Sequence, residues 1–223
     1  MEEHVLKILV VGDENVGKSS FLHRYVSGHF NRTYKMTVGV DYFIKLLLWS
    51  DKEKVKLQLW DIAGQECFIS MTRMYYKGAL GCVMMFDVTS SSSFLSCHQW
   101  KKDLDNKAML PNGDSIPCIL VANKCDLGLR AVLADSIDSF SKANGFITWM
   151  ETSVKENKNI GEAMRTLVQE ILYIKSRSDF HQPRLEDQVY PEPDSELNSG
   201  KKRIRLLLKH RFSNYLNHSL NNV

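Results

Sequence analysis

Residues 12–19 form a glycine-rich segment whose residue types and spacing suit the binding of a phosphate group. They read Gly-Asp-Glu-Asn-Val-Gly-Lys-Ser and match the pattern G-x-x-x-x-G-K-[ST]. An apolar run at 5–11 precedes the segment, and apolar side chains follow it at helical spacing from Phe21 onward. Backbone N–H groups at the start of that helix, together with the ammonium of Lys18, would face a bound anion. A chance glycine-rich turn would not need this strand and helix, so we predict a nucleoside triphosphate site.

A second polar segment, Asn123-Lys124-Cys125-Asp126, follows the apolar run at 116–122. The carboxylate of Asp126 could accept two hydrogen bonds from the N1–H and the exocyclic amine of guanine, whereas adenine offers no such pair of donors. A site built for that pairing discriminates steeply, because the wrong base leaves the carboxylate unpaired. So short a polar string is also common in surface loops, but the phosphate-binding segment upstream favours guanine over that alternative.

Two further side chains are of the kinds that bind magnesium beside a triphosphate. Ser19 ends the phosphate-binding segment and offers a hydroxyl, and Asp61 offers a carboxylate after the alternating run at 55–60. Asp61 could instead form a turn at the end of a strand. Its position ahead of Gly64 and Gln65 favours the magnesium role.

The composition is typical of a globular protein of the cytosol. The chain has 223 residues, 43% hydrophobic and 25% charged, which suits one ordinary domain and a tail. The formal net charge of +3 is too small to indicate nucleic acid as the main partner. The five cysteines show no C-x-x-C spacing, so we expect reduced thiols and neither disulfides nor a cysteine metal site. We also expect no signal peptide and no membrane-spanning segment, because no apolar run approaches ~20 residues.

The apolar pattern along the chain alternates strands with helices, which predicts an α/β fold. We expect a mostly parallel six-stranded sheet with helices on both faces and one antiparallel edge strand, supplied by a hairpin over 40–60. The predicted strands cover 5–11, 40–49, 55–60, 80–88, 116–122 and 146–150, and the predicted helices include 133–143, 160–175, one that ends near residue 27 and one capped by the serines at 90–93. Ligands bind outside the carboxyl ends of such strands, so the polar segments should converge on one rim: 12–19, 61–65, 123–126 and 151–155.

These segments together resemble the guanine-nucleotide motifs of Ras-like small GTPases, which have the P-loop NTPase fold. The matching residues, in chain order, are Gly12 to Ser19, Thr37, Asp61 to Glu66, Asn123 to Asp126 and Glu151-Thr152-Ser153. The run from Trp60 to Glu66, with Tyr75-Tyr76-Lys77-Gly78-Ala79 downstream, is similar specifically to Rab proteins. The Rab branch that serves lysosome-related organelles and the trans-Golgi is resembled by Ile62, Met71-Thr72-Arg73 and Leu110-Pro111-Asn112-Gly113. The resemblance spans roughly residues 5–175.

The resemblance implies a role for each matching position. The residues implied to bind the nucleotide are Asp13, Glu14, Asn15, Val16, Gly17, Lys18, Ser19, Ser20, Phe30, Tyr34, Thr37, Gly64, Asn123, Lys124, Asp126, Ser153, Val154 and Lys155. Ser19, Thr37 and Asp61 would bind Mg²⁺, and Gln65 would be the catalytic residue that orients the attacking water. Tyr42, Trp60 and Tyr75 match the aromatic triad through which Rabs meet effectors. Without the resemblance, ordinary sheet packing explains these three aromatic residues equally well.

The resemblance also implies a switch in vesicle and membrane trafficking. The γ-phosphate of GTP and its magnesium would hold Thr37 and Gly64 and order two loops, which relax after hydrolysis to GDP. The implied partners are a guanine-nucleotide exchange factor, a GTPase-activating protein and effector proteins, and turnover would be slow without the activating protein. The expected location is the cytoplasm, including the cytosolic face of Golgi, endosomal or lysosome-related membranes.

Three positions depart from the pattern that is usual in Rabs. Glu14 stands where a small residue is usual, and its carboxylate could either impede an activating protein or point to solvent. Asn15 is a residue that tolerates a positive φ, for which glycine is often used. Cys67 replaces the usual arginine of the second switch. Glu14 and Cys67 leave open a GTP-binding scaffold with impaired hydrolysis as the alternative function. A weaker alternative is an adenine-nucleotide kinase with a similar phosphate-binding loop.

The sequence divides into a predicted small-GTPase domain at 1–175 and a tail at 176–223. The tail has the composition of a disordered segment and contains a basic stretch at 201–211. No cysteine follows Cys125, whereas Rabs usually end in prenylated cysteines. The basic stretch could bind anionic membrane, act as a nuclear-localisation-like patch or stay solvated. We favour the solvated alternative, and we predict no prenylation and only weak, peripheral membrane association.

Overall fold

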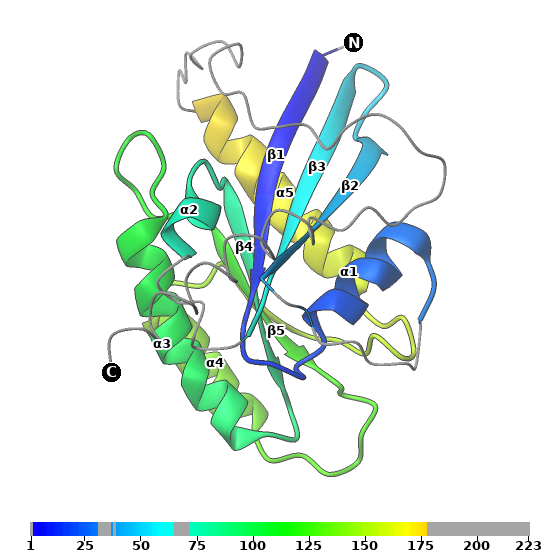
Figure 1. The fold of residues 1–223 in the computed structure, drawn as a ribbon, viewed down its shortest axis with the longest axis vertical. Helices are drawn as coiled ribbons and strands as arrows, with labels where there is room; N and C mark the ends of the chain where they lie inside the picture. The colour runs from blue at the N-terminus through cyan, green and yellow to red at the C-terminus, as the bar shows by residue number, and fades with distance from the viewer. Residues whose placement is uncertain (1, 31–36, 38, 65–71, 178–223) are drawn as a thin grey trace, which may run out of the picture. The chain divides into compact units, whose positions relative to one another are not determined.

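The computed structural model describes residues 2–30, 37, 39–64 and 72–177 (Figure 1). Its strands are β1 (Glu2–Val11), β2 (Val40–Leu48), β3 (Glu53–Ile62), β4 (Gly81–Asp87), β5 (Cys118–Asn123) and β6 (Trp149–Glu151), and its helices are α1 (Lys18–Ser27), α2 (Thr72–Tyr76), α3 (Ser91–Lys107), α4 (Ala134–Ala143) and α5 (Ile160–Arg177). Contacts divide the chain into two units, Met1–Phe180 and His181–Val223, and all described residues belong to the first.

The strands form one six-stranded sheet in the order β2-β3-β1-β4-β5-β6. β1 pairs in parallel with β3 and β4, and β5 pairs in parallel with β4 and β6. β2 runs antiparallel to β3 at the edge. The predicted α/β fold, mostly parallel with one antiparallel edge strand, is therefore confirmed.

Helices cover both faces of this sheet (Figure 1). On one face, Phe21 of α1 and Leu167 of α5 join Ile8 of β1 in a single buried cluster. On the other face, Leu104 of α3 packs in a second cluster with Leu9 of β1, together with residues of α2 and α4. Neighbouring residues of β1 thus serve opposite cores, because side chains alternate along a strand. This burial on both faces explains why every residue at 5–11 except Lys7 is apolar.

Local sequence explains how two of the helices begin and end. The side chain of Ser90 accepts a hydrogen bond from the N–H of Ser93 at 3.3 Å, so the predicted serine cap of α3 is confirmed. α1 ends at Gly28, whose φ of 73° is a left-handed conformation that costs glycine little. No helix in the described ranges is long and apolar enough to span a membrane.

Several predicted strand boundaries are wrong, among them the start of β1, which is Glu2 and not residue 5. The last strand begins at Trp149 and not at residue 146, because Phe146 is buried against Phe140 in the core. β3 continues to Ile62, so Asp61 is a strand residue and does not follow the strand end as predicted. The short helix α2 spans five residues, too few to leave a helical period in the sequence.

Candidate functional site

Polar segments that are distant in the sequence meet at the carboxyl ends of the parallel strands. The hydroxyl of Ser19, after β1, donates to Asp61 near the end of β3. The amide of Asn123, which ends β5, donates to the carbonyl of Val16 and accepts from the hydroxyl of Thr152, just beyond β6. These bonds join the ends of four strands, as the pattern of polar segments predicts.

The phosphate-binding segment has a backbone that few residue types could adopt. Gly12 has a φ of 136°, and a Cβ atom there would lie 2.1 Å from the carbonyl oxygen of Met85. Only glycine lets the loop pass this close to β4. Asn15 has a φ of 62°, as expected for an asparagine in place of glycine. The carboxylate of Asp13 accepts a hydrogen bond from Trp100 Nε1 at 2.8 Å, which connects the loop to α3.

Lys18 lies against this loop and is nearly fully buried. Its Nζ donates to the carbonyl oxygens of Gly12 and Asp13 at 2.7 and 2.6 Å. Burial lowers the pKa of Lys18 to about 8, while the negative charges of Asp61, Asp13 and Glu14 act to raise it. A phosphate group would add further negative charge beside this ammonium and favour its charged form.

Three oxygen-bearing side chains form a compact group beside the loop. Ser19 Oγ lies 2.5 Å from Asp61 Oδ2 and 2.7 Å from Thr37 Oγ1, and Thr37 Oγ1 lies 3.4 Å from the same carboxylate oxygen. Burial raises the pKa of Asp61 to about 6, against the opposing effects of Lys18 and of the bond from Ser19. Its Oδ1 is buried and has no hydrogen-bond partner among the described residues. Hard oxygen donors with an unsatisfied buried carboxylate oxygen fit a bound Mg²⁺.

The base-selecting segment is connected to the phosphate loop through Asn123. Its Nδ2 lies 2.8 Å from the carbonyl oxygen of Val16, and its Oδ1 lies 3.1 Å from Thr152 Oγ1. A Cβ atom at Gly17 would lie 2.6 Å from the same Nδ2, so the loop and the asparagine are in close contact. Asn123 therefore sets the spacing between the phosphate and base subsites.

Asp126 is held by the turn that follows β6. The hydroxyl of Ser153 donates to its Oδ1 at 2.7 Å, and Lys155 Nζ lies 3.7 Å from its Oδ2. Only 4% of the Asp126 side chain is exposed, so a guanine edge would meet a largely desolvated carboxylate. Val154, between these two residues, is buried in the core. The family resemblance implies that all four residues belong to the base pocket, and the structure brings them together.

Lys124 has a strained backbone and an ion pair. Its φ is 67°, and its Nζ lies 2.6 Å from Asp87 Oδ2 at the end of β4. Burial acts to raise the pKa of Asp87, but the hydrogen bonds from Lys124 and Thr89 lower it overall. The pairing keeps the alkyl chain of Lys124 in one direction beside the base segment. Asp87 is a positioning residue that the motif analysis did not identify.

Arg24 is another contributor that the sequence analysis missed. Its Nε donates to the carbonyl of Val154 at 3.0 Å and its Nη2 to that of Lys155 at 2.8 Å. The guanidinium also lies 5.7 Å from the ring centre of Phe30, a predicted nucleotide contact. An arginine in the helix after the phosphate loop carries no motif, so only the folded chain reveals that it connects α1 to the base turn.

Some of the remaining predicted residues lie at the phosphate loop, and others lie outside the described residues. Gly64 lies against the phosphate loop, where a Cβ atom would come within 2.2 Å of the Glu14 nitrogen. The Glu14 side chain is exposed, in agreement with the solvent-facing alternative, and Ser20 is partly buried at the start of α1. Tyr34, Gln65 and Cys67 lie outside the described residues.

The three aromatic residues predicted to face effectors do form a contiguous group. Tyr42 and Trp60 pack edge to face with ring centres 5.3 Å apart, and Tyr75 lies 6.4 Å from Trp60. Lys7 Nζ lies 4.1 Å from the centre of the Trp60 ring. Trp60 Nε1 is buried, and the described part of the chain offers it no hydrogen-bond partner. All three side chains are partly exposed, so they combine sheet packing with a free surface.

Comparison with known proteins adds independent evidence. A model of the Ras family matches residues 7–173. Ras-related protein Rab-7L1 of Homo sapiens is 59% identical over 170 residues, which make up 76% of this chain and 84% of that protein. Ras-related protein Rab-32 of Homo sapiens is 50% identical over 171 residues, 76% of each chain. Ras-related protein Rab-32A of Dictyostelium discoideum is 51% identical over 173 residues, 76% of this chain and 79% of that protein.

Proposed function

The chain belongs to the Ras family and, within it, to the Rab small GTPases, and we propose that the site described above is where it binds GTP and GDP with magnesium. It is therefore a guanine-nucleotide switch of membrane trafficking that hydrolyses GTP. The observation that carries the proposal for the site is the bond from Asn123 to the Val16 carbonyl, because it fixes the base segment beside the phosphate loop.

Each part of the site would meet a different part of the nucleotide. Backbone N–H groups of residues 13–20 and the Lys18 ammonium would neutralise the phosphates. The Asp126 carboxylate would accept the N1–H and exocyclic amine of guanine, and the turn at 153–155 would close the pocket. Phe30 and Tyr34 would border the nucleoside. Because the Asp126 carboxylate is largely desolvated, a base that cannot donate these bonds should lose much of its binding affinity.

Ser19, Thr37 and Asp61 would hold the magnesium ion. When bound, the ion neutralises charge that develops on the phosphates during hydrolysis. Ser19 and Thr37 already lie within hydrogen-bond distance of one another and of Asp61, so little rearrangement of these side chains is needed. Removal of the ion should leave the buried Asp61 charge poorly compensated and loosen the nucleotide.

The two switch contacts would report which nucleotide is bound. Thr37 and the backbone N–H of Gly64 would contact the γ-phosphate of GTP and lose that contact in GDP. Gln65 would orient the attacking water, and an activating protein would supply the positive charge that speeds the step. Glu14 is exposed, which supports hydrolysis over the scaffold alternative.

The partners and the location follow from the family. Rab proteins work with exchange factors, activating proteins and effectors, and we propose Tyr42, Trp60 and Tyr75 as part of the effector surface. We propose the cytosolic face of Golgi, endosomal or lysosome-related membranes as the place of action, on the basis of the motifs at Ile62, 71–73 and 110–113.

Nucleotide competition tests the base assignment. Fluorescent GDP bound to the protein should be displaced by GDP, more weakly by inosine diphosphate and very weakly by ADP. Inosine lacks the exocyclic amine, so one charge-assisted bond is lost, about 1.5–3 kcal/mol or roughly 10–100-fold in affinity. In Asp126→Ala the difference between GDP and inosine diphosphate should disappear. Equal displacement by ADP and GDP in the wild type would refute the guanine site.

Single-turnover hydrolysis separates the enzyme from the scaffold alternative. Protein loaded with GTP should release phosphate slowly in the presence of magnesium, and Gln65→Leu should slow this release at least tenfold. Glu14→Ser should leave the intrinsic rate within a few-fold, because the glutamate is exposed. Magnesium-dependent GTP binding without any phosphate release would support the scaffold.

A further inference from the structure

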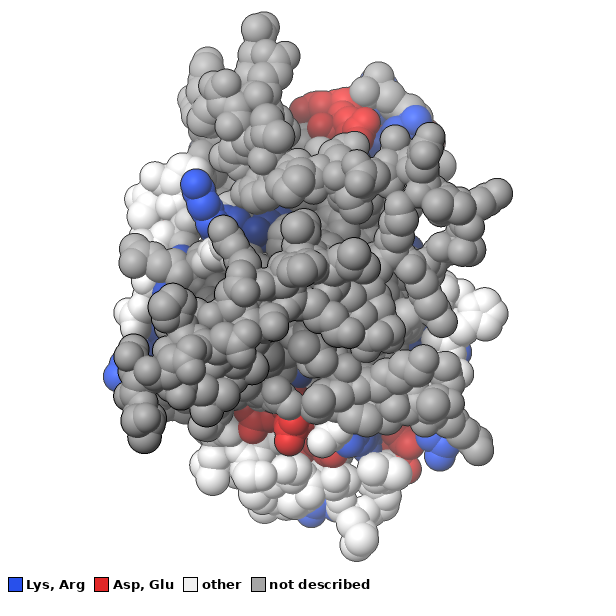
Figure 2. Space-filling model, viewed as in Figure 1, with Lys and Arg blue, Asp and Glu red and all other residues white. Residues whose placement is uncertain are grey.

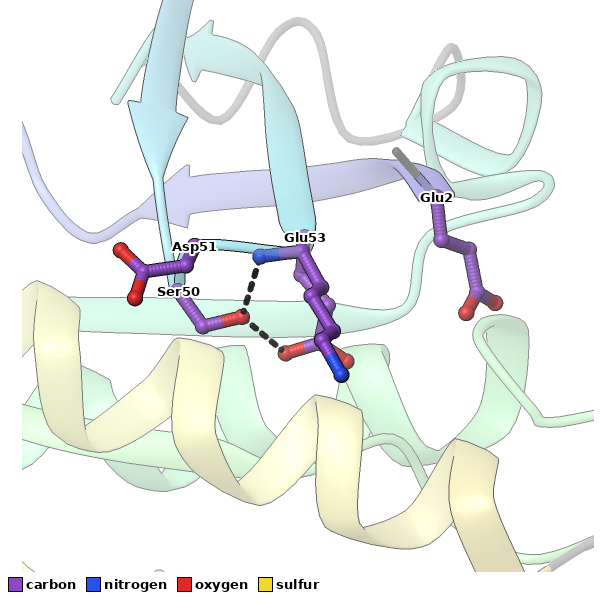
Figure 3. A pocket seen from close by; sticks show the side chains of 5 residues that line it. Glu2, Ser50, Asp51 and Glu53 are labelled. Carbon is purple, nitrogen blue, oxygen red and sulfur yellow. Dashed lines mark hydrogen bonds between the residues drawn. The ribbon is translucent and has the colours of Figure 1, made fainter.

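One histidine and two glutamates gather at the end of the sheet where β1 and β3 begin. Glu2 and His4 lie two residues apart on β1, so both side chains emerge on the same face. Glu53 starts β3 and is the direct partner of Glu2 in the parallel register. Figure 3 shows Glu2 and Glu53 extending to the same side of the sheet, toward α5. The ten residues of β1 separate this group from the nucleotide site by about 30 Å.

The distances within this group approach those of a metal site. His4 Nε2 lies 3.7 Å from a carboxylate oxygen of Glu2 and 3.8 Å from one of Glu53, and the three ligand atoms all lie within 4.8 Å of one another. A tetrahedral zinc ion with metal–ligand distances of about 2.1 Å holds its ligand atoms about 3.4 Å apart. The two contacts of the imidazole exceed that separation by a few tenths of an ångström. Small rotations of the glutamates would close the gap.

The burial and charge of these three side chains indicate how they could hold a cation. The His4 side chain is only 15% exposed, whereas Glu53 and Glu2 are 39% and 71% exposed, so a fixed imidazole meets two adjustable carboxylates. Like charges at directly paired strand positions repel, and the register of β1 and β3 keeps Glu2 and Glu53 together. Figure 2 shows acidic side chains gathered at this end of the molecule, with basic side chains beside them. A cation between the carboxylates would relieve the repulsion.

The surroundings leave room for a further ligand. Glu2 and Glu53 also line an open hollow with Ser50, Asp51 and Lys52, which gives water access (Figure 3). A site with three protein ligands and one water is an arrangement that zinc adopts readily. One nitrogen and two carboxylate donors suit Zn²⁺ better than Mg²⁺ or Ca²⁺, which prefer all-oxygen sites.

We propose that Glu2, His4 and Glu53 form a Zn²⁺ site that is separate from the magnesium of the nucleotide site. The ion would connect the first residues of β1 and β3. Without a metal, the same geometry can be explained by a protonated His4 that forms ion pairs with both glutamates. The two explanations predict different responses to zinc.

Calorimetric titration of the full chain tests the site. The protein should carry no affinity tag and should be loaded with GDP and excess Mg²⁺, so that zinc cannot enter the nucleotide site. We expect one saturable Zn²⁺ site, weakened at least tenfold by His4→Gln and by Glu53→Gln. His98→Gln is the matched control, because this exposed histidine on α3 lies outside the group, and it should bind zinc as the wild type does. No saturable binding, or unchanged binding in His4→Gln, would overturn the proposal.

Two further measurements do not depend on the folding of these variants. Co²⁺ added to the ¹⁵N-labelled wild type should shift or broaden the amide signals of residues 2–5 and 52–54. Signals that stay in place under saturating Co²⁺ would count against the site. Lys175 of α5 exerts an electrostatic effect on Glu2, so Lys175→Gln should tighten zinc binding several-fold by removing a competing positive charge. Weaker binding in that variant would contradict the assignment of Glu2.

Discussion

At the scale of single residues, Arg24 shows how a side chain without a motif can support the nucleotide site. Its two bonds to the carbonyls of Val154 and Lys155 hold the base turn against α1. Arg24→Met keeps the aliphatic stem but removes these two donors, at a cost of about 1–2 kcal/mol, together with the bond from Nη1 to the Gly28 carbonyl at the end of α1. We expect GDP to dissociate roughly 5–30-fold faster, measured with fluorescent GDP in a chase with unlabelled nucleotide. Arg165→Met is the control, and equal dissociation rates in both variants would refute this role of Arg24.

A second residue-scale prediction concerns the stability of the protein at alkaline pH. Burial lowers the pKa of Lys7 from 10.5 to about 8. The folded state therefore binds fewer protons than the unfolded state between these values, and the free energy of unfolding should rise as the pH increases from 8 to 10.5. Lys7→Met should remove this rise and stabilise the protein at pH 7.5 by up to about 3 kcal/mol, less what is lost with the Lys7 contacts, among them the bond to the Lys77 carbonyl and the contact with Trp60.

Urea unfolding at several pH values measures this effect. Lys54→Met, an exposed lysine on β3, should leave both the stability and its pH dependence close to those of the wild type. A slope that persists between pH 8 and 10.5 in Lys7→Met would show that another group titrates there. Because Lys7 lies over Trp60, the substitution also changes the aromatic surface proposed for effectors.

Residue-level reasoning from the sequence was strongest where the chemistry allows few residue types. A positive φ at Asn15 and the grouping of Ser19 with Asp61 could both be predicted, because loop geometry and oxygen donors restrict the choice. The partners of Arg24 could not be predicted. Arginine is common on helix surfaces, and its hydrogen bonds to carbonyls 130 and 131 positions away depend on the fold and not on side-chain identity.

At the scale of elements, α3 is connected to the phosphate loop by one bond. Trp100 Nε1 donates to the Asp13 carboxylate across 87 residues of sequence. Trp100→Phe should keep most of the apolar packing and lose this bond, so the loop should become less well positioned. We expect GDP dissociation to accelerate several-fold, because a bond to a charged group contributes about 1.5–3 kcal/mol and Asp13 is partly solvated in the variant.

Trp149→Phe provides a matched control on a different element. Trp149 Nε1 also donates to an aspartate, Asp138 of α4, at 3.2 Å, but this pair lies away from the phosphate loop. The control should lose a comparable bond without any change in nucleotide release. If both variants release GDP at the same increased rate, a general loss of stability is the cause and the connection from α3 has no special role.

Helices and strands could be predicted where they are long enough to show a clear apolar pattern. The apolar stripe of α5 and the mostly apolar strands β1, β4 and β5 leave clear patterns, because each element covers at least six residues. The five-residue helix α2 leaves none, and the three-residue strand β6 leaves a pattern with the wrong boundaries. The buried Phe146 lies before β6 in the sequence. The apolar pattern therefore begins ahead of the hydrogen-bonded residues, and the predicted start of the strand comes too early.

At the scale of the whole molecule, the family match and the last described helix end at nearly the same place. The family match stops at residue 173 and α5 stops at Arg177. All the nucleotide contacts proposed above come from residues 12–155. We therefore propose that the GTPase domain ends with α5 and that the tail does not contribute to nucleotide binding.

Truncation tests this domain boundary. A chain of residues 1–177 keeps every described element, so it should bind GDP with an affinity within about twofold of the full chain and unfold in one cooperative transition. A chain of residues 1–159 is the informative contrast, because it lacks α5 and the buried side chains of Ala163, Leu167 and Ile171. It should fail to fold, since these side chains complete one of the two cores. A tenfold loss of GDP affinity on removal of residues 178–223 alone would show that the tail belongs to the nucleotide-binding unit.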